Sequence, residues 1–504
     1  MTVAHGRADA LVRLHDVPVA PLSIERFSEV LDAEAFSAWT DLAERARSAL
    51  QGRVVWCVNS TANGGGVAEM LRSLLAYTRG AGVDSRWLVI DGEPEFFALT
   101  KRLHNCLHAA AGAVPPTGAD RDVYGRVTGA AAREIVELVA PGDVVILHDP
   151  QTAGLAPALH EHGIGTAWRC HVGVDRPTAQ ARAAWSFLAP YVRAADAYVF
   201  SRAGYFWDEL DGDRSVVIPP SIDVFSAKNQ ALDAATAQAI LATAGILENG
   251  RRRTGIFVRH DGSPGRVDRA AEVWQEHRVP HGAPVVTQVS RWDRLKDPLG
   301  VMHGFAMHAG TVPDAHLVIA GPATSAVADD PEGAEVLDEV VAAWQALPAG
   351  VRARVHLAAL PMDDAQENAA IVNALQSHAT VVVQKSIAEG FGLTVAEAMW
   401  KGRAVVASRI GGIQDQIVDG TSGILVDPLD LDAYGRTVAR VLGNPGLAEH
   451  LGAAARERVR EAYLGPRHLA QWFEVVERIA RPGRAGGAVA TVWATTDDSS
   501  VGSP

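Results

Sequence analysis

The feature of this sequence that most restricts its fold is the alternation of short apolar runs with longer amphipathic stretches. Each run has the composition of a buried β-strand, and the stretches between the runs have helical periodicity. Repeated strand–helix units favour parallel sheets covered by helices on both faces. The runs form two series, at 53–59, 85–90, 143–148, 165–171, 196–201 and 214–220, and at 283–290, 315–321, 353–360, 379–386, 403–408 and 423–427. The sequence therefore predicts an α/β protein with two doubly wound, Rossmann-like halves.

The two series also set the expected domain boundaries. We expect an N-terminal Rossmann-like domain over residues 1–278 and a C-terminal one over residues 279–460. A helix at 461–481 is expected to pack back on the N-terminal domain, and residues 482–504, rich in Gly, Ala, Ser and Thr, are expected to form a disordered tail. Because ligands of open α/β sheets bind beyond the carboxyl ends of the strands, two such sheets facing each other predict a central cleft.

Charge and cysteine content restrict the partners and the compartment. The formal net charge of −13 at pH 7 repels phosphate backbones and anionic membranes, and no stretch approaches the ~20 apolar residues of a membrane span. We therefore expect neither nucleic acid nor a membrane as a partner. Cys57, Cys106 and Cys170 are too few for a disulfide framework, and the N-terminus lacks an apolar leader, so we expect a cytoplasmic protein.

Two loops that follow predicted strands carry candidate anion-binding groups. The loop Asn59–Gly66 precedes a helix, so its glycine amides could approach an anion at a helix N-terminus. Asp91, at the end of the next strand, keeps a nicotinamide-binding site open as an alternative. Arg291 and Lys296 follow the strand 283–290, and two cations there suit a diphosphate that gains charge as it leaves. A solvated pair of cations is the alternative.

A third loop, Glu389–Glu397, follows the strand 379–386 and opens a helix. Its glycine amides can receive phosphate or sugar oxygens, and its carboxylates can accept protons from sugar or ribose hydroxyls. A retaining glycosidase needs two carboxylates about 5 Å apart on opposite sides of a sugar. Two acids on one loop and the following helix do not favour that geometry.

The first half contains two more polar groups. His148 and Asp149 follow one strand, while Arg169 and His171 lie on one face at the end of the next, because side chains alternate along a strand. Neighbouring strand ends favour a site here. One face of a predicted helix is either solvated or part of an acceptor pocket, and it carries Lys101, His104, Asn105 and His108. No carboxylate or cysteine completes a metal-ligand set with these histidines, so no metal site is expected.

Together these stretches resemble the retaining GT-B enzymes of glycosyltransferase family four, in particular the trehalose glycosyltransferring synthases and the related trehalose phosphorylases. The glutamate pair alone is typical of many glycosyltransferases, whereas HDPQ with WRCH, and QKS before EGFG, are narrower. The resemblance covers most of the chain and rests on NSTANGGGVAEML, FFALTKRLHN, HDPQTAGL, WRCHVGVDRP, VSRWDRLKDP and QKSIAEGFGLTVAEAMWKG.

The resemblance implies a role for each matching residue. Glu389 would hold hydroxyls of the donor sugar, Glu397 would hold the nucleotide ribose, and His171 would approach O6 of the donor sugar. The acceptor would be contacted by Asp149, Lys101 and Asn105. The residues implied for catalysis are Arg291, Lys296, His171 and Glu389. The implied nucleotide-sugar site consists of Gly65, Gly66, Arg291, Lys296, Glu389, Gly390, Phe391, Gly392, Leu393, Thr394 and Glu397.

For function, the resemblance implies retaining transfer of glucose from a nucleoside diphosphate glucose to glucose, forming α,α-trehalose. A trehalose phosphorylase and a specialised-metabolism transferase with another sugar or pseudo-sugar acceptor are the alternatives. A nicotinamide oxidoreductase leaves the second half unexplained, and a non-catalytic sensor is disfavoured because all the implied catalytic residues are present. The partners would be sugars and nucleotide sugars. No tightly bound cofactor is implied. Mg²⁺ is possible but not required by the motifs, since two cations could replace it at the diphosphate, and a homodimer rests on the resemblance alone.

Overall fold

The computed structural model describes residues 14–62, 66–110, 112–248, 255–324 and 331–481. The chain divides into two compact units: unit 1 is Met1–Pro220 with Gly465–Pro504, and unit 2 is Ser221–Leu464. The division thus falls after residue 220 and not after residue 278 as expected, because the segment between them packs with the second sheet. Ile240 and Leu241, for example, belong to a core cluster of unit 2. The predicted tail at 482–504 lies outside the described residues.

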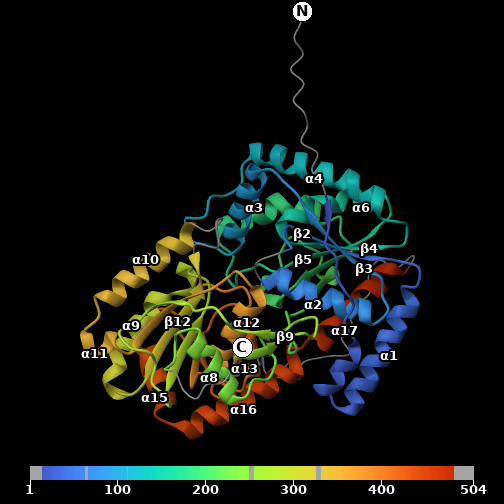
Figure 1. Cartoon of the computed structure of the whole chain (residues 1–504). Coiled ribbons are helices and arrows are strands. Elements are labelled where there is room, and N and C mark those ends of the chain that lie inside the picture. Colours follow the sequence, from blue (N-terminus) through green and yellow to red (C-terminus); the bar gives the residue numbers. More distant parts are fainter. Residues whose placement is uncertain (1–13, 63–65, 111, 249–254, 325–330, 482–504) are drawn as a thin grey trace, which may run out of the picture. The chain divides into compact units, whose positions relative to one another are not determined.

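Unit 1 is built on one seven-stranded sheet (Figure 1). Its strands are β1 (Leu14–Asp16), β2 (Val55–Asn59), β3 (Ser85–Ile90), β4 (Val144–His148), β5 (Gly165–Cys170), β6 (Ala197–Phe200) and β7 (Ser215–Val217). The spatial order is β1-β3-β2-β4-β5-β6-β7. The strands from β3 to β7 run parallel, and β1 pairs antiparallel with β3 at the edge. The six predicted strands are all present, and β1 is an addition.

Helices cover both faces of this sheet. They are α1 (Ala33–Ala49), α2 (Gly66–Gly80), α3 (Pro94–Leu107), α4 (Gly118–Leu138), α5 (Asp149–Thr152), α6 (Ala156–Glu161), α7 (Ala179–Val192) and α17 (Gly465–Ala480). On one face, Trp168 of β5 packs with Phe96 of α3 and Tyr124 of α4. On the other, α2 and α17 enclose an apolar cavity of about 40 Å³ over β2 and β4. The C-terminal helix α17 is thus part of unit 1.

Unit 2 contains a second seven-stranded sheet and a small hairpin. The hairpin is β8 (Ile256–Val258) with β9 (Pro264–Arg266), and the sheet strands are β10 (Glu272–Trp274), β11 (Val285–Val289), β12 (His316–Pro322), β13 (Val355–Leu360), β14 (Val381–Gln384), β15 (Ala404–Ser408) and β16 (Ile424–Val426). Their order is β10-β13-β12-β11-β14-β15-β16, with only β10 antiparallel to its neighbour. The six strands predicted for this half are β11 to β16.

Both faces of the second sheet are buried. The helices of unit 2 are α8 (Ala234–Thr243), α9 (Pro298–His308), α10 (Pro331–Gln345), α11 (Ala349–Arg352), α12 (Ala365–His378), α13 (Leu393–Trp400), α14 (Ile413–Gln416), α15 (Leu431–Leu442) and α16 (Pro445–Ala462). Leu317 and Ile319 of β12 pack in a cluster with α9 and α15, whereas Val318 packs in the cluster with α8 and α12. Burial on both faces explains the continuous apolar runs of the sequence.

The strand order reverses at one point in each sheet. In unit 1, β2 lies between β3 and β4, and in unit 2, β11 lies between β12 and β14. At such a point the loops leave the carboxyl ends of adjacent strands toward opposite faces, which opens a crevice for a ligand. Four of the loops singled out from the sequence follow β2, β4, β11 and β14. The topology therefore places them at the two positions where α/β sheets bind ligands.

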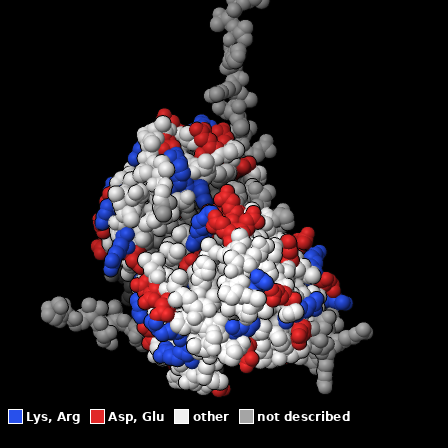
Figure 2. Space-filling model, turned by 90° about the vertical axis from the view of Figure 1, so that its left-hand side faces the viewer, with Lys and Arg blue, Asp and Glu red and all other residues white. Residues whose placement is uncertain are grey.

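Two surface properties bear on the expected partners. No helix in the described ranges is long and apolar enough to cross a membrane. On the face shown in Figure 2, acidic and basic side chains are interspersed.

Candidate active site

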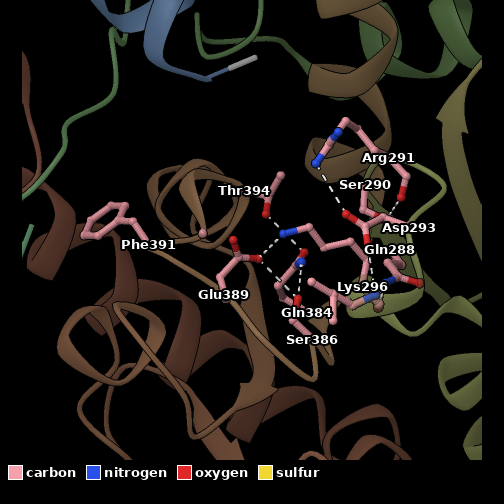
Figure 3. Close-up of polar contacts among 12 residues, drawn as sticks. Gln288, Ser290, Arg291, Asp293, Lys296, Gln384, Ser386, Glu389, Phe391 and Thr394 are labelled. Atoms are coloured by element: carbon pink, nitrogen blue, oxygen red, sulfur yellow. Dashed lines mark hydrogen bonds and ion pairs between the residues drawn. The ribbon is translucent and has the colours of Figure 1, made fainter. Parts of the chain in front are cut away.

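The enclosed part of the unit 2 site is an ion pair between the loop after β11 and the loop after β14. Lys296 Nζ lies 2.5 Å from Glu389 Oε2, and the two side chains are 18% and 11% exposed. The Ser386 hydroxyl donates to the same carboxylate oxygen at 3.2 Å. Gln384 continues this chain, because its amide nitrogen donates to Ser386 and its oxygen accepts from Thr394 (Figure 3). Glu389 is therefore held by a cation on one side and by hydroxyl and amide groups on the other.

The turn that carries Lys296 is fixed through its backbone. The 3-10 turn η5 (Arg294–Lys296) ends at Asp297, which starts α9 with a left-handed φ of 51°. Gln288 Nε2 donates to the Lys296 carbonyl at 2.7 Å, and the Ile387 N–H donates to the carbonyl of Leu295 at 2.7 Å. The ends of β11 and β14 thus hold this turn together.

Arg291 occupies a more open position. Its side chain is 60% exposed, and its guanidinium lies 3.3 Å from the Asp293 carboxylate (Figure 3). Both predicted phosphate-binding cations therefore follow β11, but Lys296 is enclosed and Arg291 faces solvent.

The glycines of the 389–397 segment allow a tight turn into α13. Gly392 has a φ of 82°, and a Cβ there would lie 3.1 Å from Ile413 and 3.2 Å from Glu389. The carbonyl of Gly390 accepts from the backbone N–H of Gly412 at 3.0 Å. Leu393 and Thr394 then begin α13, where backbone N–H groups have no partner within the helix and can receive an anion.

Phe391 contributes to this turn and not to the polar cluster. Its side chain is 7% exposed, and its ring lies 5.7 Å from that of Tyr463. Its carbonyl accepts from Gln416 Nε2 at 2.6 Å. Figure 3 shows the ring pointing away from Glu389 and Lys296.

Glu397 is a buried acid in the first turns of α13, with 3% of its surface exposed. Its Oε1 lies 3.3 Å from Lys228 Nζ, while its buried Oε2 has no hydrogen-bond partner in the part of the chain that the structure describes. A buried carboxylate oxygen without a donor is costly, and a ligand hydroxyl would remove that cost. Lys228 was not anticipated, because nothing in its local sequence indicates a partner in α13.

In unit 1, Asp149 lies at the start of α5 with an unusual backbone conformation, at a φ of 63°. Its Oδ1 accepts from the backbone N–H of His171 at 2.8 Å, and its carbonyl accepts from the Trp168 indole at 3.1 Å. Burial raises the pKa of Asp149 to about 6, against the opposing effects of the His171 N–H and the Arg169 charge. A non-glycine residue held at positive φ is strained, and such strain is concentrated at functional sites.

Two histidine rings pair beside Asp149. His148 Nδ1 lies 3.1 Å from His171 Nε2, and the rings are nearly parallel with centroids 5.4 Å apart. Burial and then the nearby Arg169 charge lower the pKa of His148 to about 3, and the same causes lower that of His171 well below its usual value. Both rings are therefore neutral near pH 7, and a ligand contact by His171 would use Nδ1.

Arg169 is the buried cation of this cluster, with no exposed surface. In the register of β4 and β5, Arg169 lies opposite His148. The Nη2 of Arg169 donates to the Ser201 hydroxyl at 3.3 Å. The alternation of GTAWRCH places Arg169 on the face of His171, but only the structure shows how fully the guanidinium is buried.

The remaining predicted residues stand as follows. Lys101 is exposed and Asn105 partly buried on α3, which packs against α5, and their acceptor role stays a prediction. Gly66 is the exposed first residue of α2, and Gly65 lies outside the described residues. Among the residues that are described, no group of three or more His, Cys, Asp or Glu side chains could hold a metal ion.

Two protein families match the chain: "Trehalose synthase, N-terminal domain" over residues 57–207 and "Glycosyl transferases group 1" over residues 271–458. The trehalose synthase of Rubrobacter xylanophilus is 35% identical over 88% of this chain and 94% of its own length. The trehalose phosphorylase of Pleurotus pulmonarius is 25% identical over 91% of this chain but 61% of the phosphorylase.

A solved structure extends the comparison to the fold. A UDP-forming α,α-trehalose-phosphate synthase from Burkholderia xenovorans superposes with a TM-score of 0.61 at 15% identity, over 84% of this chain and 98% of that chain. The two Rossmann-like sheets, with polar loops where the strand order reverses, are those of a GT-B glycosyltransferase. Within that class, the chain belongs to the trehalose synthase family.

Proposed function

We propose that this chain transfers glucose from a nucleoside diphosphate glucose to glucose, forming α,α-trehalose with retention of the anomeric configuration. The observation that carries the proposal is the pair formed by Lys296 and Glu389 where the strand order of unit 2 reverses. A cation suited to phosphate and an acid suited to sugar hydroxyls lie within one hydrogen bond of each other. A nucleotide sugar has both groups in adjacent positions.

In this proposal, different residues of unit 2 contact the diphosphate, the glucose and the ribose of the donor. Lys296 and Arg291 meet the diphosphate as it gains charge, and the first N–H groups of α13 add to this stabilisation. Glu389 accepts hydroxyl protons of the glucose. The unpartnered Oε2 of Glu397 supports a further hydroxyl contact, which we assign to the ribose.

Retention follows from attack on the face that the diphosphate leaves. The acceptor oxygen forms its bond to the anomeric carbon as the bond to the diphosphate oxygen breaks, and the acceptor proton passes to a leaving-group oxygen. Glu389 and Glu397 are paired with lysines and are assigned hydroxyl contacts in this proposal, so no carboxylate is assigned the part of a nucleophile. Positioning and charge stabilisation then supply the catalysis.

Unit 1 is assigned the contacts to uncharged sugar groups. Asp149 would orient the acceptor, and neutral His171 would contact a donor-sugar hydroxyl through Nδ1. Two cations at the diphosphate make Mg²⁺ unnecessary in this proposal, so a chelator should leave the rate unchanged.

The proposal is tested by incubating the purified chain with glucose and UDP-, ADP- or GDP-glucose and following the products by proton NMR. Formation of α,α-trehalose with release of the nucleoside diphosphate is expected for at least one donor. Formation of a β-linked product would contradict the retaining course.

A trehalose phosphorylase is the second candidate, favoured by the relationship to the Pleurotus enzyme and by cations that suit inorganic phosphate equally well. Trehalose with phosphate would then release glucose 1-phosphate, while no nucleotide sugar would react. Silence in both assays would instead favour a transferase with a different sugar or pseudo-sugar.

A further inference from the structure

We propose that Lys385 is a positioning residue that sets the place of Lys296 by holding Asp297, the next residue along the turn. The inference rests on the proposed role of Lys296 as the diphosphate contact, and it assigns a function to the lysine of the QKS segment that precedes Glu389.

Lys385 is the most deeply buried cation near the donor cluster. Its side chain is 1% exposed, and Nζ forms an ion pair with Asp297 Oδ2 and donates to the Pro428 carbonyl at 2.7 Å. A buried ammonium group is costly unless it is paired and hydrogen-bonded. Since its contacts are made within the protein, Lys385 acts on a ligand only through its neighbours.

Asp297 is where the ion pair has its effect. The residue has a φ of 51°, a left-handed conformation that is strained for a non-glycine residue and persists only when its surroundings enforce it. Its Oδ1 accepts from the Gly300 N–H at 3.0 Å, which caps α9. Lys385 holds Oδ2 of the same carboxylate, so the ion pair and the cap together fix the backbone that directs the Lys296 side chain.

The three residues of the QKS segment contact both sides of the ion pair between Lys296 and Glu389. Gln384 and Ser386 form a series of side-chain hydrogen bonds that ends at Glu389 Oε2. Lys385, which lies between them in the sequence, instead contacts Asp297 in the turn of Lys296. Consecutive side chains at a strand end point in alternating directions, which makes this division geometrically natural. The end of β14 therefore places both the acid and the cation.

The first test measures the position of Lys296 without any substrate. The chain has five lysines, Lys101, Lys228, Lys296, Lys385 and Lys401, so limited acetylation by acetic anhydride can be followed residue by residue by mass spectrometry. In Lys385→Met, the amine of Lys296 is expected to react severalfold faster, with Lys101 of unit 1 as the internal reference. Unchanged reactivity of Lys296 in the folded variant would overturn the proposal.

A control variant tests whether the loss of a partly exposed ion pair elsewhere in unit 2 has the same effect. Arg352→Met breaks the ion pair of Arg352 with Glu276, 2.7 Å long, at the amino-terminal edge of the same sheet, away from the donor cluster. This control is expected to leave both the acetylation of Lys296 and the turnover unchanged. An equal rise of Lys296 reactivity in both variants would show that loss of stability is the cause and would also overturn the proposal.

The second test measures turnover and donor KM. Displacement of a reacting or binding group by about 1 Å costs on the order of 10²-fold, so Lys385→Met is expected to lower kcat by about 10- to 100-fold. Lys385→Arg should recover part of that loss. The double variant with Lys296→Ala should be no slower than Lys296→Ala alone, whereas multiplying losses would contradict action through Lys296.

Failure of this proposal and failure of the proposed function have different signatures. If Lys296→Ala leaves turnover unchanged, the diphosphate contact is wrong, while the acetylation result still decides whether Lys385 positions Lys296. If Lys385→Met does not fold, Asp297→Asn removes the same ion pair and keeps a residue that tolerates the left-handed conformation. Faster acetylation of Lys296 is expected there as well, and an unchanged rate would reject the proposal.

Discussion

The polar clusters of the two units differ in how their groups are charged. In unit 2, Lys296 and Glu389 stay close together as an ion pair with some exposure to solvent. In unit 1, burial keeps His148 and His171 neutral and raises the pKa of Asp149 to about 6. A diphosphate can replace Glu389 as the partner of Lys296, whereas the two neutral imidazoles beside Asp149 suit an uncharged sugar. The comparison thus predicts that charge-removing changes are most damaging in unit 2.

The largest expected effect is that of Lys296→Ala. Removing a preorganised contact to developing charge typically lowers kcat by about 10²- to 10³-fold, and we expect a loss of this size with the fold intact. Steady-state kinetics with circular dichroism as a check of folding would measure it. Unchanged turnover would remove the diphosphate contact from the proposal.

Arg294→Ala is the matched control for that variant, since Arg294 lies in the same turn. Its guanidinium pairs with acids of α10, lying 2.6 Å from Glu339 and 3.6 Å from Glu332. Turnover should stay close to that of the unaltered chain. A loss comparable with that of Lys296→Ala would mean that the whole turn, and not one ammonium group, carries the effect.

Asp149→Asn is expected to have the next largest effect. A hydrogen bond to a charged group contributes about 1.5–3 kcal/mol, so kcat/KM for the acceptor should fall about 10- to 100-fold. Because the pKa of Asp149 is about 6, we also expect the activity of the unaltered chain to fall as the pH drops below about 6 and the carboxylate takes up a proton. An activity that is flat down to pH of about 5 would break the assignment.

The same variant tests burial through stability. Because the folded pKa of Asp149 lies above the unfolded value of about 3.9, the group stabilises the fold below about pH 4 and loses that contribution as the pH rises through about 6. The Tm of Asp149→Asn, relative to the unaltered chain, should therefore be higher at neutral pH than at pH 4. A difference that shrinks toward neutral pH would have the wrong sign for a carboxylate raised by burial.

Gly392→Ala tests the geometry of the unit 2 cluster. The left-handed conformation costs an alanine about 1–2 kcal/mol, and the new Cβ would press on Glu389, so both the free energy of unfolding and the affinity for the donor should fall. Gly420→Ala is the matched control, because Gly420 has a φ of 77° and open space around its Cβ position. Denaturant unfolding should show a loss in both variants, at least as large in Gly392→Ala because of its close contacts, and only Gly392→Ala should raise the donor KM.

The sequence was sufficient to predict the fold but not its edges or its division. Most residues of strands β2 to β7 and β11 to β16 are buried, so their apolar runs are evident locally. Strands β1 and β10 have three residues each and are defined by antiparallel pairing with β3 and β13, which no local pattern reveals. The boundary at 278 was wrong for the same reason, since the packing of α8 with α12 joins residues distant in the chain.

The candidate site shows the same limit. Residues placed at strand ends by spacing, such as Lys296 and Glu389, were predictable, because a parallel sheet brings its carboxyl ends to one edge. The ion pairs around them were not predictable, since Lys228 meets Glu397 and Lys385 meets Asp297 only through tertiary packing. Phe391 is the opposite case. Its place in the motif suggested a ligand contact, whereas its side chain is buried beside Tyr463.

We expect the smallest effects from Lys101→Ala and Asn105→Ala, which test whether α3 contacts the acceptor. Lys101 is exposed, and a contact made by an exposed charged side chain is worth about 0–1 kcal/mol, so the KM for the acceptor should rise by at most about fivefold, with the donor KM unchanged. Titrations of each substrate at saturating concentrations of the other would show this. A large loss in Lys101→Ala would mean that unit 1 relies on a cation as unit 2 does, and the contrast between the two clusters would fail. An unchanged acceptor KM in both variants would restrict the acceptor contacts to Asp149 and its neighbours.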